Sequence, residues 1–160
     1  MKSTDNLRRQ HRELLRIGAE MVGLIAMEAA QRDVYKLRSL IAQMAGILNV
    51  HLAMEDGVMY PQLLRHPDPE LRAIAKRFID EMGGLKAAFT AYVEKWNVPR
   101  AIMDEPVAFA RETANLIDLL SRRIEREDRD LYPEVDAIAA GTPRTGTSVR
   151  PAGGHAEQRG

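Results

Sequence analysis

Apolar residues recur at helical spacing in four separate stretches of this sequence of 160 residues. The first stretch runs from about Ser3 to Ala30, and the others cover about 33–61, 68–96 and 104–139. A period of three or four residues places the apolar side chains on one face of an α-helix. Long helices joined by short connections pack as antiparallel neighbours. The sequence therefore predicts an all-α fold, an up-down-up-down antiparallel four-helix bundle.

Proline and capping residues separate the four predicted helices. Asp33 is placed to cap the second helix, and the Asp-Pro-Glu sequence at 68–70 is typical of the start of the third. Pro61 lies near the end of the second helix and Pro133 near the end of the fourth, where a proline kinks or ends a helix. We expect the third helix to run without a break to about Trp96.

The same periodicity predicts which residues face the bundle core. Most are Leu, Ile, Met or Phe, but His, Arg and Glu side chains also fall on the inner faces. The predicted inner positions are Leu7, His11, Leu14, Gly18, Met21, Ile25, Leu37, Leu40, Met44, Ile47, Leu48, His51, Glu55, Val58, Leu71, Ile74, Phe78, Met82, Leu85, Phe89, Val93, Phe109, Leu116, Leu120, Arg123, Glu127 and Leu131.

Charge and composition exclude several classes of function. Acidic and basic residues balance at 23 each, so no global field attracts nucleic acid or an anionic membrane, and we expect neither as a partner. Cysteine is absent, which excludes disulfides, thiolate nucleophiles and sulfur-ligated metals. The N-terminal segment lacks the apolar core of a secretory signal, and the apolar stretch 18–30 is too short to span a bilayer. A cytoplasmic protein is expected.

The last twenty residues differ in composition from the rest. Residues 141–160 are rich in Gly, Pro, Thr and Arg, and Val149 is their one large apolar side chain. Such a segment cannot bury enough surface to offset the entropy lost on ordering. We predict one bundle domain over 1–140 and a disordered C-terminal tail over 141–160, with His155 in the tail.

The second and fourth predicted helices carry the same motif. HLAMEDGVMYP at 51–61 aligns without gaps on RIEREDRDLYP at 123–133, an offset of 72 residues. Nearly the same offset relates His11 to Met82. The chain therefore looks like two helical hairpins related by a pseudo-two-fold axis, whose equivalent positions meet near the bundle axis. The residues expected at that level of the core are His11, His51, Glu55, Met82, Arg123 and Glu127.

This expected cluster places two carboxylates in an apolar core. An unpaired ionised carboxylate is costly there, so it must pair, protonate or bind a cation. His51 and Glu55 are four residues apart and lie on one helix face, as metal ligands do in helical bundles. Imidazole nitrogen together with carboxylate oxygen suits iron, manganese or zinc. Other polar residues are not expected in the site: His66 lies in a loop, and Tyr60 and Tyr132 either hydrogen-bond at the bundle end or pack ahead of the prolines, with packing favoured.

The motifs resemble those of the hemerythrin-like (HHE cation-binding) family over about residues 5–137. The resemblance rests on His11 in RRQHREL, on HxxxED at 51–56 and on the ED-x3-YP sequence that occurs twice. It implies a bundle with a non-haem di-iron centre, in proteins that bind oxygen, sense nitric oxide or redox state, or serve iron-linked repair. Carried over by position, the metal ligands would be His11, His51 and Glu55 on one iron, with Glu127 bridging.

The chain departs from the family pattern in its second half. Met82 and Arg123 stand where histidines are expected, and Lys86 stands where the oxygen carriers have a further histidine. The second iron would lack its imidazole ligands, so we expect a single ion at most. Arg123 could instead neutralise both glutamates, and Lys86 could contribute.

The sequence is compatible with two functions. The first is a sensing or regulatory bundle that holds one iron ion in a half-site and responds to a small diatomic ligand. The second is a metal-free bundle for protein–protein interaction or regulation, in which Arg123 replaces the metal. An enzyme is not expected, because di-iron oxidase or repair chemistry needs two metals and no other catalytic motif is present.

Overall fold

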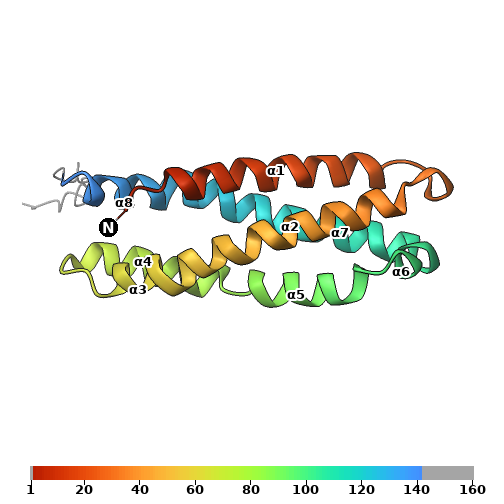
Figure 1. Cartoon of the computed structure of the whole chain (residues 1–160). Coiled ribbons are helices and arrows are strands. Elements are labelled where there is room, and N and C mark those ends of the chain that lie inside the picture. The colour runs from red at the N-terminus through yellow and green to blue at the C-terminus, as the bar shows by residue number, and fades with distance from the viewer. Residues whose placement is uncertain (1, 142–160) are drawn as a thin grey trace, which may run out of the picture.

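Four long helical segments run back and forth along one axis in the computed structural model of this chain (Figure 1). The structure describes residues 2–141, apart from the side chain of Met82. The predicted antiparallel four-helix bundle is confirmed. The predicted tail, except for Gly141, lies outside the described residues. The bounds of the α-helices are α1 Asp5–Ile25, α2 Val34–Met54, α3 Tyr60–Leu64, α4 Pro69–Met82, α5 Leu85–Trp96, α6 Pro99–Asp104, α7 Pro106–Arg126 and α8 Tyr132–Ala139.

The first helical segment is shorter than predicted. Helix α1 ends at Ile25, and a single 3₁₀ turn, Ala29–Gln31, leads to α2. The predicted caps are present: the Asp33 carboxylate accepts the backbone N–H of Lys36 at 2.9 Å, and Asp68 accepts that of Glu70 at 2.8 Å. Each cap satisfies an N–H that the first helical turn leaves without a backbone partner.

Neither Pro61 nor Pro133 ends its helix. A π-helical turn, Glu55–Met59, joins α2 to α3, and a second one, Glu127–Leu131, joins α7 to α8. Proline lacks an N–H, and its ring clashes with the carbonyl four residues earlier in an α-helix. The wider π turn relieves that clash while the helix continues. The second and fourth helical segments therefore continue through their prolines.

The π turn explains one error in the predicted core. Val58 was expected to face inward, but it is 53% exposed, whereas Met59 is buried. A π turn holds one more residue than an α turn, so the helix returns to its inner face one position later. Of the other predicted inner positions whose side chains the structure describes, Ile25, Ile47, Ile74 and Val93 are half-buried and the rest are buried.

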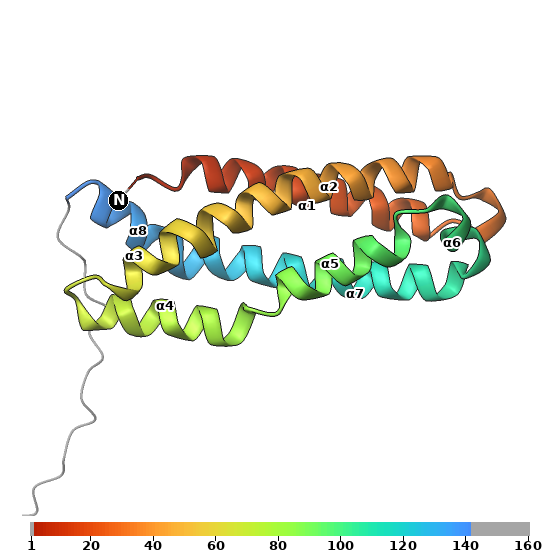
Figure 2. The same cartoon turned by 60° about the horizontal axis from the view of Figure 1, so that its bottom comes forward.

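The third helical segment is not continuous. It breaks at Gly83–Gly84 into α4 and α5, as the bend in Figure 2 shows. Two successive glycines favour a break because each costs about 1 kcal/mol in a helix interior. A Cβ atom at Gly83 would also lie 2.7 Å from the carbonyl oxygen of Ile79. The predicted unbroken helix to Trp96 is therefore wrong, and Lys86, just after the break, is exposed.

The apolar core is divided into two parts by a layer of polar residues. The larger part lies among α1, α2, α5, α6 and α7, and it includes Leu48, Trp96 and Phe109. The smaller part lies at the other end of the bundle and includes Leu7, Met59, Phe78 and Leu131. The buried polar and charged residues that the structure describes are Thr4, His11, His51, Glu55, Thr113, Arg123 and Glu127.

The helical segment Val34–Leu64 is the most apolar part of the described chain. By length and composition alone it could cross a bilayer. In the bundle it packs Leu37, Met44 and Leu48 into the larger core, and the same face carries His51 and Glu55 inward. Packing in the bundle core therefore explains why this helical segment is so apolar.

Replacement of Phe109 by Ala tests the larger core. The ring is fully buried and makes an edge-to-face contact with Trp96 at 5.3 Å between centroids. We expect the free energy of unfolding to fall by about 3–5 kcal/mol, measured by urea denaturation. The matched control is Val107→Ala on the same helix, where the side chain is 78% exposed and the expected change is below about 0.5 kcal/mol. Equal losses in the two variants would contradict this assignment of the core.

Candidate metal centre

Four potential metal ligands meet in the polar layer. His11 comes from α1, His51 from α2, and Glu55 and Glu127 each begin a π-helical turn. At most 2% of any of these side chains is exposed, and one ligand atom from each lies within 4.8 Å of all the others. The structure thus brings together all four residues predicted as ligands. That they bind metal stays a prediction at this point.

The π turns place each glutamate and the following tyrosine on one helix face. The backbone N–H of Tyr60 bonds to the carbonyl of Glu55, and that of Tyr132 bonds to the carbonyl of Glu127. In an α-helix a residue five positions on points well away from the first, since each step turns the chain by about 100°. The wider turn brings the pair closer to alignment, so both side chains reach the polar layer.

The two tyrosines bond across the pseudo-two-fold axis. The Tyr132 hydroxyl donates to Glu55 Oε1 at 2.5 Å, and the Tyr60 hydroxyl donates to Glu127 Oε1 at 3.0 Å. Each tyrosine therefore donates a hydrogen bond to the glutamate of the other hairpin. Both tyrosines thus form hydrogen bonds, the less favoured of the two alternatives, and they do so in the centre of the core rather than at the bundle end.

Arg123 joins the two glutamates. Its Nε donates to Glu127 Oε1 at 2.7 Å, and its Nη2 donates to Glu55 Oε2 at 2.7 Å. Burial alone would lower the pKa of Arg123, but the charges of Glu127 and Glu55 raise it above the ordinary value, so the guanidinium stays charged. The predicted pairing of Arg123 with both glutamates is confirmed, although its single positive charge compensates only one of the two carboxylates. The exposed Lys86 takes no part in it.

Hydrogen bonds on the far side of each imidazole orient the two histidines. His11 Nδ1 lies 2.9 Å from the Asp128 carboxylate, and His51 Nδ1 lies 3.1 Å from the amide oxygen of Gln10. Both partners are acceptors, so each Nδ1 carries the proton when the ring is neutral. Partners of this kind commonly hold histidine ligands in place in metal sites. Both Nε2 atoms then present lone pairs to the interior.

The interior of the cluster is short of hydrogen-bond donors. The two Nε2 lone pairs face each other at 3.1 Å, which is repulsive unless a proton or a metal ion lies between them. Glu127 Oε2 lies 3.4 Å from His11 Nε2. It is the one buried side-chain nitrogen or oxygen in residues 2–141 that lacks a hydrogen-bond partner. The Nε2 atoms of His11 and His51 and the Oε2 atom of Glu127 thus converge with lone pairs that need a proton or a metal ion between them.

Ion pairs and hydrogen bonds keep the Glu55 carboxylate ionised in the core. Burial alone would raise the pKa of Glu55, but the interactions with His51 and Arg123 outweigh burial and hold the pKa at about 2. Burial and the charges of both glutamates raise the pKa of Tyr132 and of Tyr60, so the phenols remain protonated donors. In the state able to bind metal, in which both imidazoles are neutral, two ionised carboxylates and one guanidinium would leave one negative charge in the core.

The donor set fits a single divalent transition metal. Two imidazole nitrogens bound to one ion at about 2.1 Å in adjacent octahedral positions lie about 3.0 Å apart, and the observed Nε2 separation is 3.1 Å. Glu127 Oε2 and a Glu55 oxygen would supply the carboxylate ligands, a combination that suits iron, manganese or zinc. A second ion would have to lie beside the charged guanidinium, which repels it.

The sequence predicted all four candidate ligands but not the residues that hydrogen-bond to them. Gln10, Asp128, Tyr60 and Tyr132 all bond directly to the four candidate ligands, yet none was predicted in the site. A signal was present for the tyrosines, since the same Glu-x4-Tyr-Pro spacing occurs twice. No such signal exists for Gln10 and Asp128. Each bonds to a histidine on another helical segment, His51 and His11 respectively, and the sequence pattern does not show such contacts. Met82, predicted in this layer, has no described side chain.

Comparison with known proteins gives one match. Residues 2–135 match the family model described as the hemerythrin HHE cation-binding domain. The matched range includes every residue of the polar layer and nearly all of the described chain. No curated protein and no solved structure matches significantly. The resemblance inferred from the repeated motif is therefore confirmed at the level of the family.

Replacement of Arg123 by Met tests the ionic part of the centre. The variant keeps much of the side-chain volume but leaves two buried carboxylates without their cation, so we expect metal-free protein to lose about 3–5 kcal/mol of unfolding free energy. The control is Arg122→Met, which breaks an exposed ion pair with Asp118 and should cost at most about 1 kcal/mol. Thermal denaturation in the presence of a chelator measures both. Similar midpoints for the two variants would show that the guanidinium is dispensable.

Proposed function

This chain belongs to the hemerythrin HHE cation-binding family, and from that premise we propose that it binds one divalent metal ion, with iron as the first candidate, and acts as a sensing or regulatory module. The ion would be held by His11, His51, Glu55 and Glu127, whose ligand atoms already lie together. The observation that carries the proposal is Glu127 Oε2, which is buried and unpartnered beside two facing imidazole nitrogens. A metal ion satisfies all three atoms at once.

The presence of Arg123 supports one ion rather than two. In the repeat, Arg123 occupies the position that corresponds to His51, and its guanidinium bonds to both glutamates. It removes one imidazole from the second half of the site and adds a positive charge there. One remaining negative charge in the core suits a single divalent ion much better than a pair of ions.

Such a centre suits binding and signalling more than catalysis. A bound iron ion would supply a Lewis-acid and redox-active position for a small ligand such as oxygen or nitric oxide. The chain itself excludes water with apolar core on both sides of the layer and holds the phenol of Tyr132 3.2 Å from His11 Nε2. We propose a cytoplasmic, non-enzymatic module whose response passes to a protein partner, with no role for nucleic acid or membrane.

A metal-free regulatory bundle is the second candidate. The observation that favours it is the bridge from Arg123 to both glutamates, with both distances at 2.7 Å. A guanidinium in this place already takes over much of the electrostatic role of a metal ion. In this case a proton between His11 and His51 would satisfy the facing nitrogens; the pKa of His11 is raised, because Glu127 and Asp128 outweigh burial. Metal content separates the two candidates.

Metal analysis of protein purified from iron-supplemented medium tests the leading proposal. We expect about one equivalent per chain, and less than about 0.1 equivalent in His51→Ala and Glu127→Gln, because each loses a ligand. At a free metal concentration about 100 times the Kd, stabilisation of the wild type should reach about 2.7 kcal/mol. His66→Ala is the control, since His66 accepts a bond from the Asp68 N–H in a distant loop. Wild-type protein without metal, and without thermal stabilisation by added iron, would refute the proposal.

Replacement of Arg123 by His tests how the arginine limits the site. The variant removes the guanidinium and restores an imidazole in the position equivalent to His51. We expect metal content to rise above that of the wild type, toward two equivalents, because repulsion falls and a ligand is gained. Elemental analysis measures it, with Arg122→His as the exposed control. A rise from no metal in the wild type to one equivalent would instead favour the metal-free candidate.

A further inference from the structure

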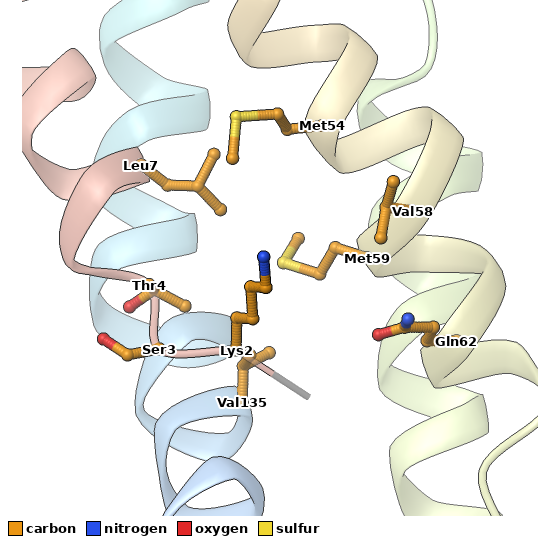
Figure 3. A pocket seen from close by; sticks show the side chains of 9 residues that line it. All are labelled: Lys2, Ser3, Thr4, Leu7, Met54, Val58, Met59, Gln62 and Val135. Carbon is orange, nitrogen blue, oxygen red and sulfur yellow. The ribbon is translucent and has the colours of Figure 1, made fainter.

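A pocket separate from the metal centre opens at the end of the bundle that carries the N-terminus. Its volume is about 440 Å³, within the range of about 300–1,000 Å³ typical of small-molecule sites. Figure 3 shows that its walls come from segments far apart in the sequence: the N-terminal segment, α1, the end of α2 with its π turn, and α8. None of the four candidate ligands lines it. The apolar lining residues are Leu7, Met54, Val58, Met59 and Val135.

Lys2 is the one cationic side chain among the described residues that line the pocket. Figure 3 shows the side chain of Lys2 among the residues that line the pocket. Within the described part of the chain, no acidic group pairs with Lys2. Lys2 is exposed, so its ammonium can be reached by a ligand from solvent, and an anion at that point gains a charge-assisted hydrogen bond, which is stronger than a neutral one.

The segment that carries Lys2 is held in place. The buried Thr4 donates its backbone N–H to Asp136 at 2.7 Å and its hydroxyl to the same carboxylate at 2.8 Å. Arg8 also pairs with Asp136, at 3.3 Å. The N-terminal wall is therefore tied to α8, two residues from Lys2. The pocket is a built feature of the bundle end and does not depend on a loose terminus folding over it.

We propose that this pocket binds a small amphipathic monocarboxylate, such as a medium-chain fatty acid. Its carboxylate pairs with the Lys2 ammonium, and its alkyl chain lies among Leu7, Met59 and Val135. The flexible thioethers of Met54 and Met59 adapt the wall to chains of different shape. A cationic or purely apolar ligand of the same length lacks the ion pair, so the pocket discriminates by headgroup as well as by chain. This site is independent of metal in the polar layer.

Titration calorimetry of the full chain with butanoate, hexanoate and octanoate tests the chain contribution. Each methylene that the pocket buries should raise the affinity about fourfold until the pocket is full. Octylamine and 1-octanol test the headgroup, and both should bind more weakly than octanoate. Absence of saturable octanoate binding up to about 10 mM, or equal binding of all three headgroups, would overturn the proposal.

Matched variants locate the binding. Lys2→Gln should weaken octanoate about fivefold and leave 1-octanol unchanged, whereas Lys86→Gln, at an exposed lysine outside the pocket, should change neither. Val58→Glu places a like charge in the pocket wall and should weaken octanoate about tenfold or more. Val50→Glu is its control, because Val50 lies on the same helical segment, is 54% exposed against 53% for Val58, and does not line the pocket.

A last variant separates this pocket from the metal centre. A carboxylate could also bind a metal ion in the polar layer, so the titration is repeated with His51→Ala. Unchanged octanoate affinity in that variant supports the pocket, whatever the metal content of the wild type. Loss of binding in His51→Ala, together with normal binding in Val58→Glu, would place the carboxylate at the metal centre and refute the proposed site.

Discussion

The bridge from Arg123 to Glu55 and Glu127 is the interaction on which the centre of this bundle depends. Two carboxylates at one level of an apolar core cost far more than the net stability of a domain allows unless their charges are compensated. The guanidinium compensates one charge and bonds to both groups. It leaves one carboxylate oxygen, Glu127 Oε2, without a partner. Arg123 thus stabilises the core but leaves one carboxylate charge uncompensated, and the proposed cation would compensate it.

The two hairpins of the chain share a backbone plan and differ in their chemistry. Each has a glutamate at the start of a π turn and a tyrosine that crosses to the glutamate of the other hairpin. At the position one turn before the glutamate, one hairpin has His51 and the other has Arg123. The first offers a lone pair to a metal ion and the second offers a positive charge in its place. Under the proposed function, that single difference is what limits the site to one ion.

The rest of the fold isolates the polar layer and holds its parts. Apolar core on both sides keeps water away, so hydrogen bonds and charges act more strongly there than at the surface. Asp128 and Gln10 orient the imidazoles from the outside. The pocket at the N-terminal end lies beyond this layer, with Leu7 one turn before His11 on the same helix. The bundle therefore has two distinct regions with binding chemistry, one polar and enclosed, the other apolar and open.

The sequence by itself determined the bundle, because side-chain burial follows α-helical spacing over most of the chain. The internal repeat also determined which residues meet, since equivalent positions in paired hairpins lie at one level of the core. Tertiary structure decided what local patterns do not encode. It placed the π turns that align Glu55 with Tyr60, the break at Gly83–Gly84, and the bonds that set the tautomers of the histidines. These features depend on contacts between helices. Such contacts do not produce a periodic pattern in the sequence of either helix, so they cannot be predicted from it.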